Sequence, residues 1–288
     1  MSVELSNAQR AEVLSQAMPY IQQYRGKVIA IKYGGNAMVS AELKQHVMED
    51  IALLRMMGVK VVLIHGGGPD INDMLAKLGI ESHFVNGLRV TDEKTIEVVQ
   101  MVLAGKVNKG LVQLLGSHGV RAVGLSGVDD NLIQAEMKDP ELGYVGRITG
   151  VNVQLVEDLM NDGYIPVICS VGRDAQGNAY NINADTAAAC IAGAVHAERL
   201  FMMTDIAGVM RDPKDPGSLI SSMDIKEAKK LFEEGIISGG MIPKVECCID
   251  AIRHGVKSVV VMDGRIPHAI LLETLTDEGT GTMVMEKR

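Results

Sequence analysis

Short apolar runs alternate along the chain with segments whose apolar residues recur every three or four positions. The first pattern is typical of buried strands, and the second is typical of helices that cover them. Strands are predicted at 27–32, 59–64, 122–125, 165–169, 200–203 and 258–262. Helices are predicted at 40–57, 70–78, 153–162, 184–195, 224–234, 241–254 and 267–274, with two more between about 91 and 118. This alternation favours an α/β fold.

Two kinds of segment depart from the alternation. Asn7 to Tyr24 reads as an amphipathic helix that Pro19 should kink. It either lies on the domain, which the pattern slightly favours, or forms an arm that reaches a neighbouring subunit. Residues 130–152 and 173–178 carry glycine and asparagine turn signals, so hairpins are predicted there.

Two of the predicted strands end in consecutive glycines. Lys32–Tyr33–Gly34–Gly35–Asn36 follows the first strand, and His65–Gly66–Gly67–Gly68–Pro69 follows the second. Glycine lets a backbone approach a ligand closely, and the N–H groups at such a turn suit phosphates and carboxylates. A lone lysine at a strand end is usually solvated. Beside Gly34 and Gly35, however, Lys32 is better explained as a cation that serves an anion.

Composition narrows the class of protein. The 288 residues include no Trp, three Phe and six Tyr, so the core must be aliphatic. A net charge of -8 argues against a basic face that binds nucleic acid. The four cysteines lack metal-site spacing and are expected to be reduced, mostly buried thiols. Without a membrane-length apolar run or a signal-peptide layout, a cytoplasmic location is expected.

Three further segments hold polar residues that have both an ordinary and a functional explanation. Asn181–Ile182–Asn183–Ala184–Asp185 opens an alanine-rich helix; capping needs one such residue, and three suggest a polar site. Lys244 follows a Gly-Gly turn into a helix, where a cation opposes the helix dipole unless an anion binds. Arg89, in the turn Asn86–Arg89, could bind a carboxylate, although most lone arginines are surface residues.

Several nucleotide-binding signatures are absent from the sequence. It has no Walker A pattern and none of the loop signatures of protein kinases. The His65-Gly-Gly-Gly run is also not the G-x-G-x-x-G dinucleotide pattern, so a dehydrogenase is disfavoured.

These segments together resemble the amino acid kinase family, and within it the branch that phosphorylates N-acetyl-L-glutamate. The matching pieces are Lys32-Tyr-Gly-Gly-Asn-Ala, His65-Gly-Gly-Gly-Pro, Asn86-Gly-Leu-Arg-Val-Thr, Asn181-Ile-Asn-Ala-Asp and Gly240-Met-Ile-Pro-Lys244. The resemblance implies a three-layer α/β/α sandwich around one mainly parallel sheet. It also implies an N-terminal helical arm over 1–26, an N-acetylglutamate-binding lobe over 27–180 and a lobe over 181–288 that binds ATP with Mg²⁺.

The resemblance also implies roles for individual residues. Lys32 and Lys244 would stabilise the transferring phosphoryl group, and Asp185 would orient both lysines. Amides of Gly34, Gly35 and Gly66 would surround the phosphoryl group. The acceptor would be held by Gly67, Gly68, Arg89, Asn181 and Asn183. The nucleotide would be held by Asp205, Ile206, Ala207, Gly208, Val209, Met210, Ile236, Ile237 and Ser238, with Mg²⁺ carried by ATP and no metal ligand from the protein.

The chemistry of the reaction fits these residue types. A carboxylate acceptor with a pKa of about 4.3 is already ionised at neutral pH, so no general base is needed. What the reaction requires is alignment of the reactants and neutralisation of charge on the phosphoryl oxygens.

Two segments resemble the arginine-inhibited, hexameric enzymes of this branch: the kinked N-terminal helix, and the C-terminal stretch around His268 and Thr276–Thr282. In such enzymes the N-terminal helices interlace dimers into a ring. The candidate arginine contacts here are Tyr20, Arg199, His268, Glu278 and Gly281. Arg199 stands where many of these enzymes have lysine, which leaves the strength of inhibition open. Docking of a nitrogen-signalling PII protein also stays open.

Two alternatives remain at this point. The chain could be another kinase of the superfamily, acting on aspartate, glutamate, carbamate or UMP, which the segments 86–91 and 181–185 disfavour. It could instead be a non-catalytic ligand sensor with the same fold, which the presence of both Lys32 and Lys244 disfavours.

Overall fold

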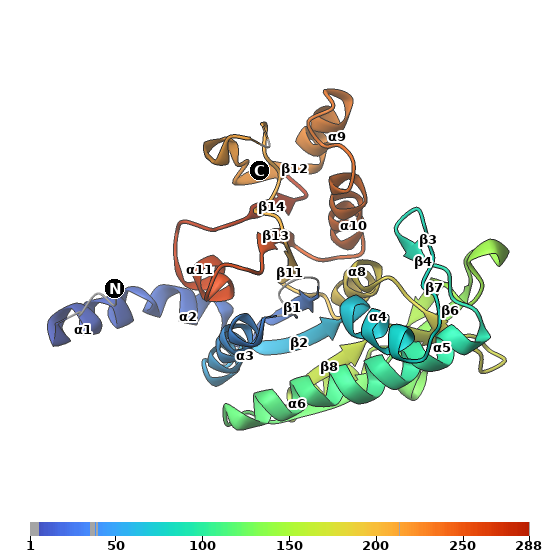
Figure 1. The fold of residues 1–288 in the computed structure, drawn as a ribbon. Helices are drawn as coiled ribbons and strands as arrows, with labels where there is room; N and C mark the ends of the chain where they lie inside the picture. The colour runs from blue at the N-terminus through green and yellow to red at the C-terminus, as the bar shows by residue number, and fades with distance from the viewer. Residues whose placement is uncertain (1–5, 35–37, 39, 213, 288) are drawn as a thin grey trace.

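A computed structural model describes residues 6–34, 38, 40–212 and 214–287. An eight-stranded sheet crosses the molecule in the order β12-β14-β13-β11-β1-β2-β8-β5 (Figure 1). Its strands are β1 (Val28–Tyr33), β2 (Lys60–His65), β5 (Ala122–Ser126), β8 (Ile165–Cys169), β11 (Arg199–Thr204), β12 (Ser222–Asp224), β13 (Ser258–Asp263) and β14 (Thr282–Met285). Neighbours from β13 to β5 are parallel, whereas β14 runs antiparallel to β13. The central sheet is therefore mainly parallel, as predicted.

Helices cover both faces of this sheet. One face packs against α3 (Ala41–Met56), α4 (Gly68–Lys77), α11 (Ala269–Leu275) and a long helical run made of α5 (Glu93–Gln100), the π-helical segment η2 (Met101–Val107) and α6 (Asn108–Ser117). The other face packs against α7 (Gln154–Asn161), α8 (Ala184–Ala194), α9 (Ile225–Glu233) and α10 (Met241–Arg253). Strand alternation separates the two cores: Ile29 and Ile31 face the first, and Ala30 faces the second. The three-layer prediction is confirmed.

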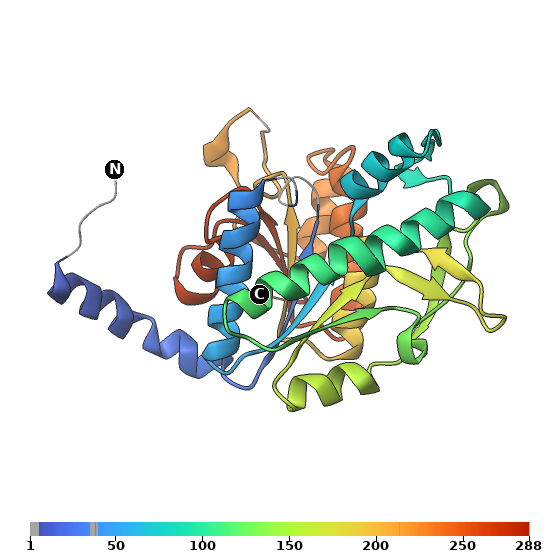
Figure 2. The same cartoon turned by 60° about the horizontal axis from the view of Figure 1, so that its bottom comes forward.

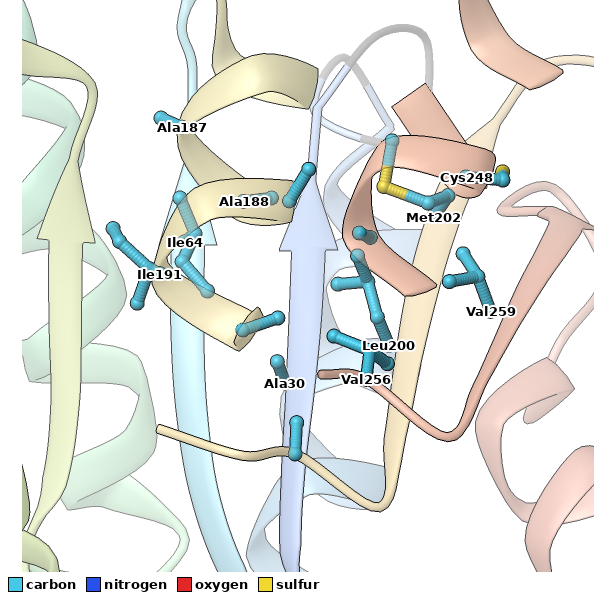
Figure 3. Packing of buried hydrophobic residues seen from close by; sticks show 14 of the residues in the cluster. Ala30, Ile64, Ala187, Ala188, Ile191, Leu200, Met202, Cys248, Val256 and Val259 are labelled. Atoms are coloured by element: carbon cyan, nitrogen blue, oxygen red, sulfur yellow. The ribbon is translucent and has the colours of Figure 1, made fainter. Parts of the chain in front are cut away.

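Where α8 meets the sheet, the second core is rich in alanine. Figure 3 shows Ala187, Ala188 and Ile191 of α8 against the strands that carry Ala30 and Ile64. A side chain added at Gly193 would place its Cβ 2.5 Å from the Cβ of His254, so α8 and the end of α10 lie in close contact. The alanine-rich sequence of α8 thus brings the start of this helix close to the ends of β1 and β2.

The N-terminal helix is split as predicted, but its first half does not lie on the domain. α1 (Asn7–Gln16) and α2 (Met18–Tyr24) meet at Ala17, and Pro19 occupies the first turn of α2. α1 reaches away from the rest of the chain in both views (Figures 1 and 2) and has no buried residue. Its apolar Leu14 is 72% exposed. Only α2 packs on the body, through the buried Tyr24 and through contact with α11.

The predicted hairpins are present. β6 (Ile133–Met137) pairs antiparallel with β7 (Gly146–Val151), and β9 (Val171–Arg173) pairs antiparallel with β10 (Ala179–Asn181). These four strands form a second sheet. A small hairpin joins β3 (Phe84–Val85) to β4 (Leu88–Arg89). Three-residue 3₁₀ turns cover Asp129–Asn131, Pro140–Leu142 and Pro216–Ser218.

Three predictions about elements need correction. The helix expected from residue 70 begins at Gly68, so the glycine loop itself forms the helix N-terminus. The two helices expected between residues 91 and 118 form one run, because the π-helical segment joins them without a break. The short strand β12 was not predicted, since three residues are too few to show an alternating pattern.

The fold also bears on the cysteines and on membranes. All four cysteines are free thiols, and Cys169 and Cys248 are buried. Among the helices that the structure describes, none combines the length and apolar character needed to cross a bilayer.

Candidate functional site

Two lysines from distant parts of the chain meet on one carboxylate. Lys32 Nζ lies 2.9 Å from Asp185 Oδ1, and Lys244 Nζ lies 3.5 Å from Asp185 Oδ2. Lys32 is buried, with 8% of the residue exposed, and its Nζ also donates to the carbonyl oxygen of Met203 at 3.4 Å. The three charged groups form a cluster, here called the lysine–aspartate cluster.

Local structure places each member of this cluster. Lys32 falls on the same face of β1 as Ala30, the face that α8 covers. Asp185 lies in the first turn of α8, and Lys244 lies in the first turn of α10. The side chain of Asn183 caps α8 by accepting from the N–H groups of Asp185 and Thr186 at 3.0 and 3.1 Å. Because Asn183 supplies the cap, the carboxylate of Asp185 is left for the lysines.

Burial and charge act in opposite directions on Asp185. Burial raises the pKa of its carboxyl group, but the two lysine ammonium groups outweigh this and hold the pKa below its ordinary value. Asp185 is therefore ionised at neutral pH, and the cluster carries one net positive charge. A site of this kind attracts an anion.

The glycine loops lie beside the cluster. A Cβ at Gly34 would be 3.1 Å from Lys32 Nζ, so Gly34 lies directly against the lysine. A Cβ at Gly66 would be 3.1 Å from the Cβ of Ala184, which brings the second loop against the start of α8. The Gly66 N–H already donates to the Tyr33 carbonyl oxygen at 3.3 Å, which joins the two loops. Gly35 lies outside the described residues.

Gly67 explains why the second loop needs glycine. It is the N-cap residue of α4, and Gly68 is the first residue of that helix. A Cβ at Gly67 would come within 2.6 Å of Leu103 Cδ2 and 3.2 Å of Val107 Cγ2. Both of these side chains belong to the π-helical segment, which therefore presses on the loop. The N-terminus of α4 supplies the positive end of a helix dipole at this point.

A first pocket of about 170 Å³ opens next to these loops. Of the residues predicted to bind the acceptor, all five line it: Gly67, Gly68, Arg89, Asn181 and Asn183. Gly66 lines it as well, together with Phe84 and Ser170, among others. The pocket combines an apolar wall with a few polar groups, which suits a small organic ligand.

Arg89 is held firmly at this pocket. It is 7% exposed, and its Nη2 donates to the Gly68 carbonyl oxygen at 3.3 Å, while Nη1 donates to the Ser82 hydroxyl. Its guanidinium carbon lies 4.7 Å from the centre of the Phe84 ring. Burial lowers the pKa of Arg89, yet a guanidinium remains charged in proteins. The side chain thus presents a fixed cation to the pocket.

Thr91 joins Arg89 to Asn181, and sequence reasoning did not single it out. Its hydroxyl donates to the Arg89 carbonyl oxygen at 2.9 Å and accepts from Asn181 Nδ2 at 3.3 Å. Thr91 is fully buried. Thr91 belongs to the Asn86–Thr91 motif, and this was the one sign of its importance in the sequence. The motif alone does not show which of its residues contact a ligand and which hold those residues in place.

A second feature that sequence reasoning missed lies beneath the glycine loop. His65 is fully buried; its Nδ1 is 2.8 Å from the Gly66 carbonyl oxygen, and its Nε2 is 3.0 Å from Asn108 Nδ2. Asn108 also donates to the carbonyl oxygens of Leu125 and Val167. Burial lowers the pKa of His65 to about 4. The imidazole is therefore neutral at pH 7, with its proton placed on Nδ1 by the Gly66 carbonyl.

A second pocket of about 360 Å³ lies on the other side of the lysine–aspartate cluster. Lys244 lines it. So do seven of the nine residues predicted to bind nucleotide: Asp205, Ile206, Gly208, Val209, Met210, Ile236 and Ser238. The other two, Ala207 and Ile237, do not line it. Asp185 is the next residue in the chain after Ala184, and Ala184 lines the first pocket. The cluster therefore lies between the two pockets.

The last strand of the chain supports the second pocket. Val209 N–H donates to the Thr282 hydroxyl at 2.8 Å. Gly208 has a positive φ of 146°, and a Cβ there would lie 2.5 Å from the same hydroxyl oxygen. Only glycine fits this close approach between the loop and β14.

The residues predicted to bind arginine do not all meet. Arg199 lines a pocket of about 270 Å³ with Glu273 and Asp277. Tyr20 donates to Asp277 Oδ1 at 2.5 Å. Gly281 N–H donates to Glu273 Oε1 at 2.8 Å, but neither Gly281 nor Glu278 lines this pocket. His268 does not line it either, and pairs instead with Asp50.

Comparison with known proteins places these observations in context. Residues 27–263 match the model of the amino acid kinase family. The acetylglutamate kinase of Clostridium beijerinckii is 54% identical over 283 residues, which cover 97% of this chain and 99% of that protein.

Solved structures show the same fold. The N-acetylglutamate synthase of Neisseria gonorrhoeae superposes with a TM-score of 0.84 at 26% identity; the match covers 96% of this chain and 64% of that longer one. The carbamate kinase of Giardia lamblia shares the fold at 18% identity, with a TM-score of 0.65. The family match over residues 27–263 and the near-full-length relative together show that the chain belongs to the amino acid kinase family.

Proposed function

We propose that this protein transfers the γ-phosphoryl group of ATP to the side-chain carboxylate of N-acetyl-L-glutamate. The observation that carries the proposal is the lysine–aspartate cluster between two pockets, one lined by Arg89 and the other by Lys244. The choice of acceptor rests on relatives at 51–54% identity over nearly the whole chain that are named acetylglutamate kinases.

In the proposed reaction, a carboxylate oxygen of the acceptor attacks the γ-phosphorus of ATP. The bond from this phosphorus to the bridging oxygen breaks, and ADP leaves with that electron pair. The products are an acyl phosphate and ADP. No proton has to be removed from the acceptor, because its carboxylate is already ionised at neutral pH.

The two lysines supply the charge that the reaction needs. Lys32 and Lys244 would contact oxygens of the travelling phosphoryl group, and Asp185 would keep their nitrogens on either side of it. Fixed cations placed around the travelling group stabilise the charge that its oxygens and the leaving oxygen share in the transition state. Amides of Gly34 and Gly67 would add neutral donors from the two loops.

The second pocket fits a nucleotide. Its lining is mostly apolar and includes the side chains of Val209 and Met210. Lys244 lines the same pocket and also belongs to the lysine–aspartate cluster. An adenosine would occupy the apolar part and direct its phosphates toward Lys244. Mg²⁺ would arrive with ATP and neutralise part of the phosphate charge.

The first pocket fits the acceptor. Arg89 would pair with the α-carboxylate of N-acetylglutamate through its guanidinium, and Asn181 would donate a hydrogen bond to the same end of the molecule. The carboxylate to be phosphorylated would then point toward the glycine loops and Lys32. Asn183 lines the pocket while capping α8.

A direct test measures ADP release with ATP, Mg²⁺ and one acceptor at a time. N-acetyl-L-glutamate should support turnover, whereas aspartate, glutamate, carbamate and UMP should not. Turnover with another member of this panel, and none with N-acetylglutamate, would reassign the chain to a different kinase of the family. No ADP release with any acceptor would support a ligand sensor.

Arg89 gives a sharper test of the acceptor pocket. Arg89→Lys keeps the charge but loses the planar fork and the contact with the Phe84 ring, so the KM for N-acetylglutamate should rise about tenfold or more. The KM for ATP should stay the same. Steady-state kinetics with each substrate varied in turn measure both values.

The matched control for this substitution is Arg121→Lys. Arg121 also stacks on an aromatic ring, that of Tyr164, but it precedes β5 at the opposite ends of the strands. Its variant should match the parent in both KM values. An equal rise in the KM for ATP and N-acetylglutamate in Arg89→Lys would argue against the assigned role.

The N-terminal arm supports a finer proposal, that copies of this chain assemble through α1 into a ring and that L-arginine inhibits the assembled enzyme. α1 extends away from the body (Figure 1), and its Val13 and Leu14 are exposed. Monomers seldom display such a helix without a partner. The base of the arm lies beside the pocket that Arg199 and Asp277 line, because Tyr20 of α2 donates a hydrogen bond to Asp277.

Removal of residues 1–25 tests the assembly. The truncated chain should have a mass no greater than that of a dimer, whereas the full chain should form a hexamer, as measured by light scattering after gel filtration. Leu14→Lys offers a milder change of the same surface and should weaken assembly without touching the core. A hexamer that survives truncation would contradict the role of the arm.

A further inference from the structure

A cluster of polar side chains lies apart from the two pockets, where α3 meets the start of α11. His46, Glu49 and Asp50 come from α3, and His268 is the N-cap residue of α11. One ligand atom each from His46, Glu49 and His268 lie within 4.8 Å of one another. The two imidazole rings are 4.7 Å apart between centres. The proposed kinase chemistry uses none of these residues.

Buried atoms without partners gather in this cluster. In the described part of the chain, two buried side-chain polar atoms have no hydrogen-bond partner: His46 Nδ1 and Asp50 Oδ2. Such atoms are rare in folded proteins, and an ion or water commonly satisfies them. His46 is one of the three residues whose ligand atoms converge, so a bound ion is the simplest missing partner for it, whereas the Asp50 carboxylate already lies near the backbone N–H groups of Ile270 and Leu271.

Asp50 and His268 form an arrangement found around bound metals. Asp50 is 1% exposed, and its Oδ1 lies 2.6 Å from His268 Nδ1. A histidine that binds a metal through one ring nitrogen usually donates the other N–H to a carboxylate, which fixes the ring. Here the contact with Asp50 leaves Nε2 of His268 available.

We propose that His46, Glu49 and His268 bind a divalent transition metal ion, with Zn²⁺ the best match to the donors. Two imidazoles and one carboxylate, with a water in the fourth position, are a known zinc ligand set. Mg²⁺ and Ca²⁺ prefer all-oxygen sites, so the histidines select against them.

The three ligand atoms have to move only a short distance to reach the spacing found around a zinc ion. Ligand atoms around tetrahedral zinc lie about 3.3 Å apart, given Zn–N bonds of about 2.0–2.1 Å. The side chain of Glu49 is exposed and that of His268 is 44% exposed, so both can adjust by the necessary ångström or so. The same exposure lets an ion enter from solvent.

A metal at this position would join two elements that are far apart in sequence. It would tie α3 to the N-cap residue of α11, and α11 packs against α2 at the base of the N-terminal arm. The ion would therefore stiffen the support of the arm rather than take part in phosphoryl transfer.

Metal titration of the full chain tests this inference without any measurement of turnover. After treatment with a chelator, and with no ATP present, the protein is titrated with ZnCl₂ by calorimetry and with Co²⁺ by absorption spectroscopy. We expect one Zn²⁺ per chain and a cobalt spectrum of a tetrahedral nitrogen and oxygen site. The melting temperature should rise with added Zn²⁺.

Variants separate this site from the four thiols and from other histidines. His46→Asn and Glu49→Gln should weaken binding at least about 100-fold, and Asp50→Asn should weaken it about 10- to 100-fold through loss of ring orientation. His254→Asn, an exposed histidine on α10, is the control and should bind as the parent does.

Two results would overturn the inference. One is equal Zn²⁺ affinity in the parent, His46→Asn and Glu49→Gln; the other is a cobalt spectrum with thiolate charge-transfer bands, which would place the ion on cysteine. Glu49 is exposed, so its variant tests the site even if a change at the buried Asp50 impairs folding.

Discussion

Replacing Lys32 by alanine should lower kcat about 100-fold or more, which is the scale for the loss of one fixed transition-state contact. Its Nζ lies 2.9 Å from Asp185 Oδ1. Because Lys32 is buried, no cation from the solvent can replace its charge in the alanine variant. Lys244→Ala should have an effect of the same order, because its Nζ contacts the other oxygen of Asp185. The KM values should change much less than kcat, since both lysines act on charge that develops during transfer.

Lys60→Ala is the matched control for these variants. Lys60 starts the neighbouring strand β2 and donates to Asn161 Oδ1 at 2.7 Å, far from the strand ends that carry the site. It should retain the parental kcat. Pre-steady-state measurement of phosphoryl transfer, with melting temperatures for all three variants, distinguishes lost chemistry from lost structure. Near-parental transfer rates in Lys32→Ala and Lys244→Ala would refute their roles.

The free energy of unfolding should fall by about 2 kcal/mol between pH 7.5 and pH 5 because of His65 alone. Its pKa is about 4 in the folded protein, where burial lowers it, and about 6.5 in the unfolded chain. Between these values the unfolded chain binds more protons, so stability rises with pH. The contribution of neutral His65 is fully present above pH 6.5 and is lost as the pH falls toward 4.

His65→Gln isolates this effect. Glutamine cannot titrate, so the variant should be less stable than the parent at pH 7.5 but should lose less stability on acidification. Urea unfolding at pH 7.5, 6 and 5, at one protein concentration, gives the free energies. If the two proteins lose the same free energy between pH 7.5 and 5, His65 is not the buried neutral group described here.

The order of strands and helices could be predicted because the local sequence dictates it. The apolar run at 165–169 and the alanine-rich segment at 184–195 each carry enough periodicity to identify an element. The second sheet, by contrast, depends on its two hairpins pairing through Gln134 and Arg173, 39 positions apart in the chain, which periodicity does not encode. Periodicity alone did not decide between a helix on the domain and an exposed arm, because an amphipathic pattern does not say whether its partner is the same chain or another.

The site was predictable where a residue type is unusual for its local structure. Lys32 at the end of an apolar strand and Lys244 in a first helical turn both need an anion to explain them, and Asp185 joins them. Thr91 and Asn108 escaped notice because each looks like an ordinary polar residue near a helix start or within a helix. Their importance comes from burial against Asn181 and His65, which only the tertiary structure reveals.

The place of β14 in the sheet has a consequence for how a newly made chain matures. This strand is the last in sequence, yet it lies between β12 and β13 rather than at an edge. Its Thr282 also holds the loop at Val209. Until the ribosome has made and released Thr282–Met285, β12 lacks its neighbour in the sheet and the loop at Val209 lacks its anchor. A growing chain therefore has the residues of the first pocket well before it can complete the second.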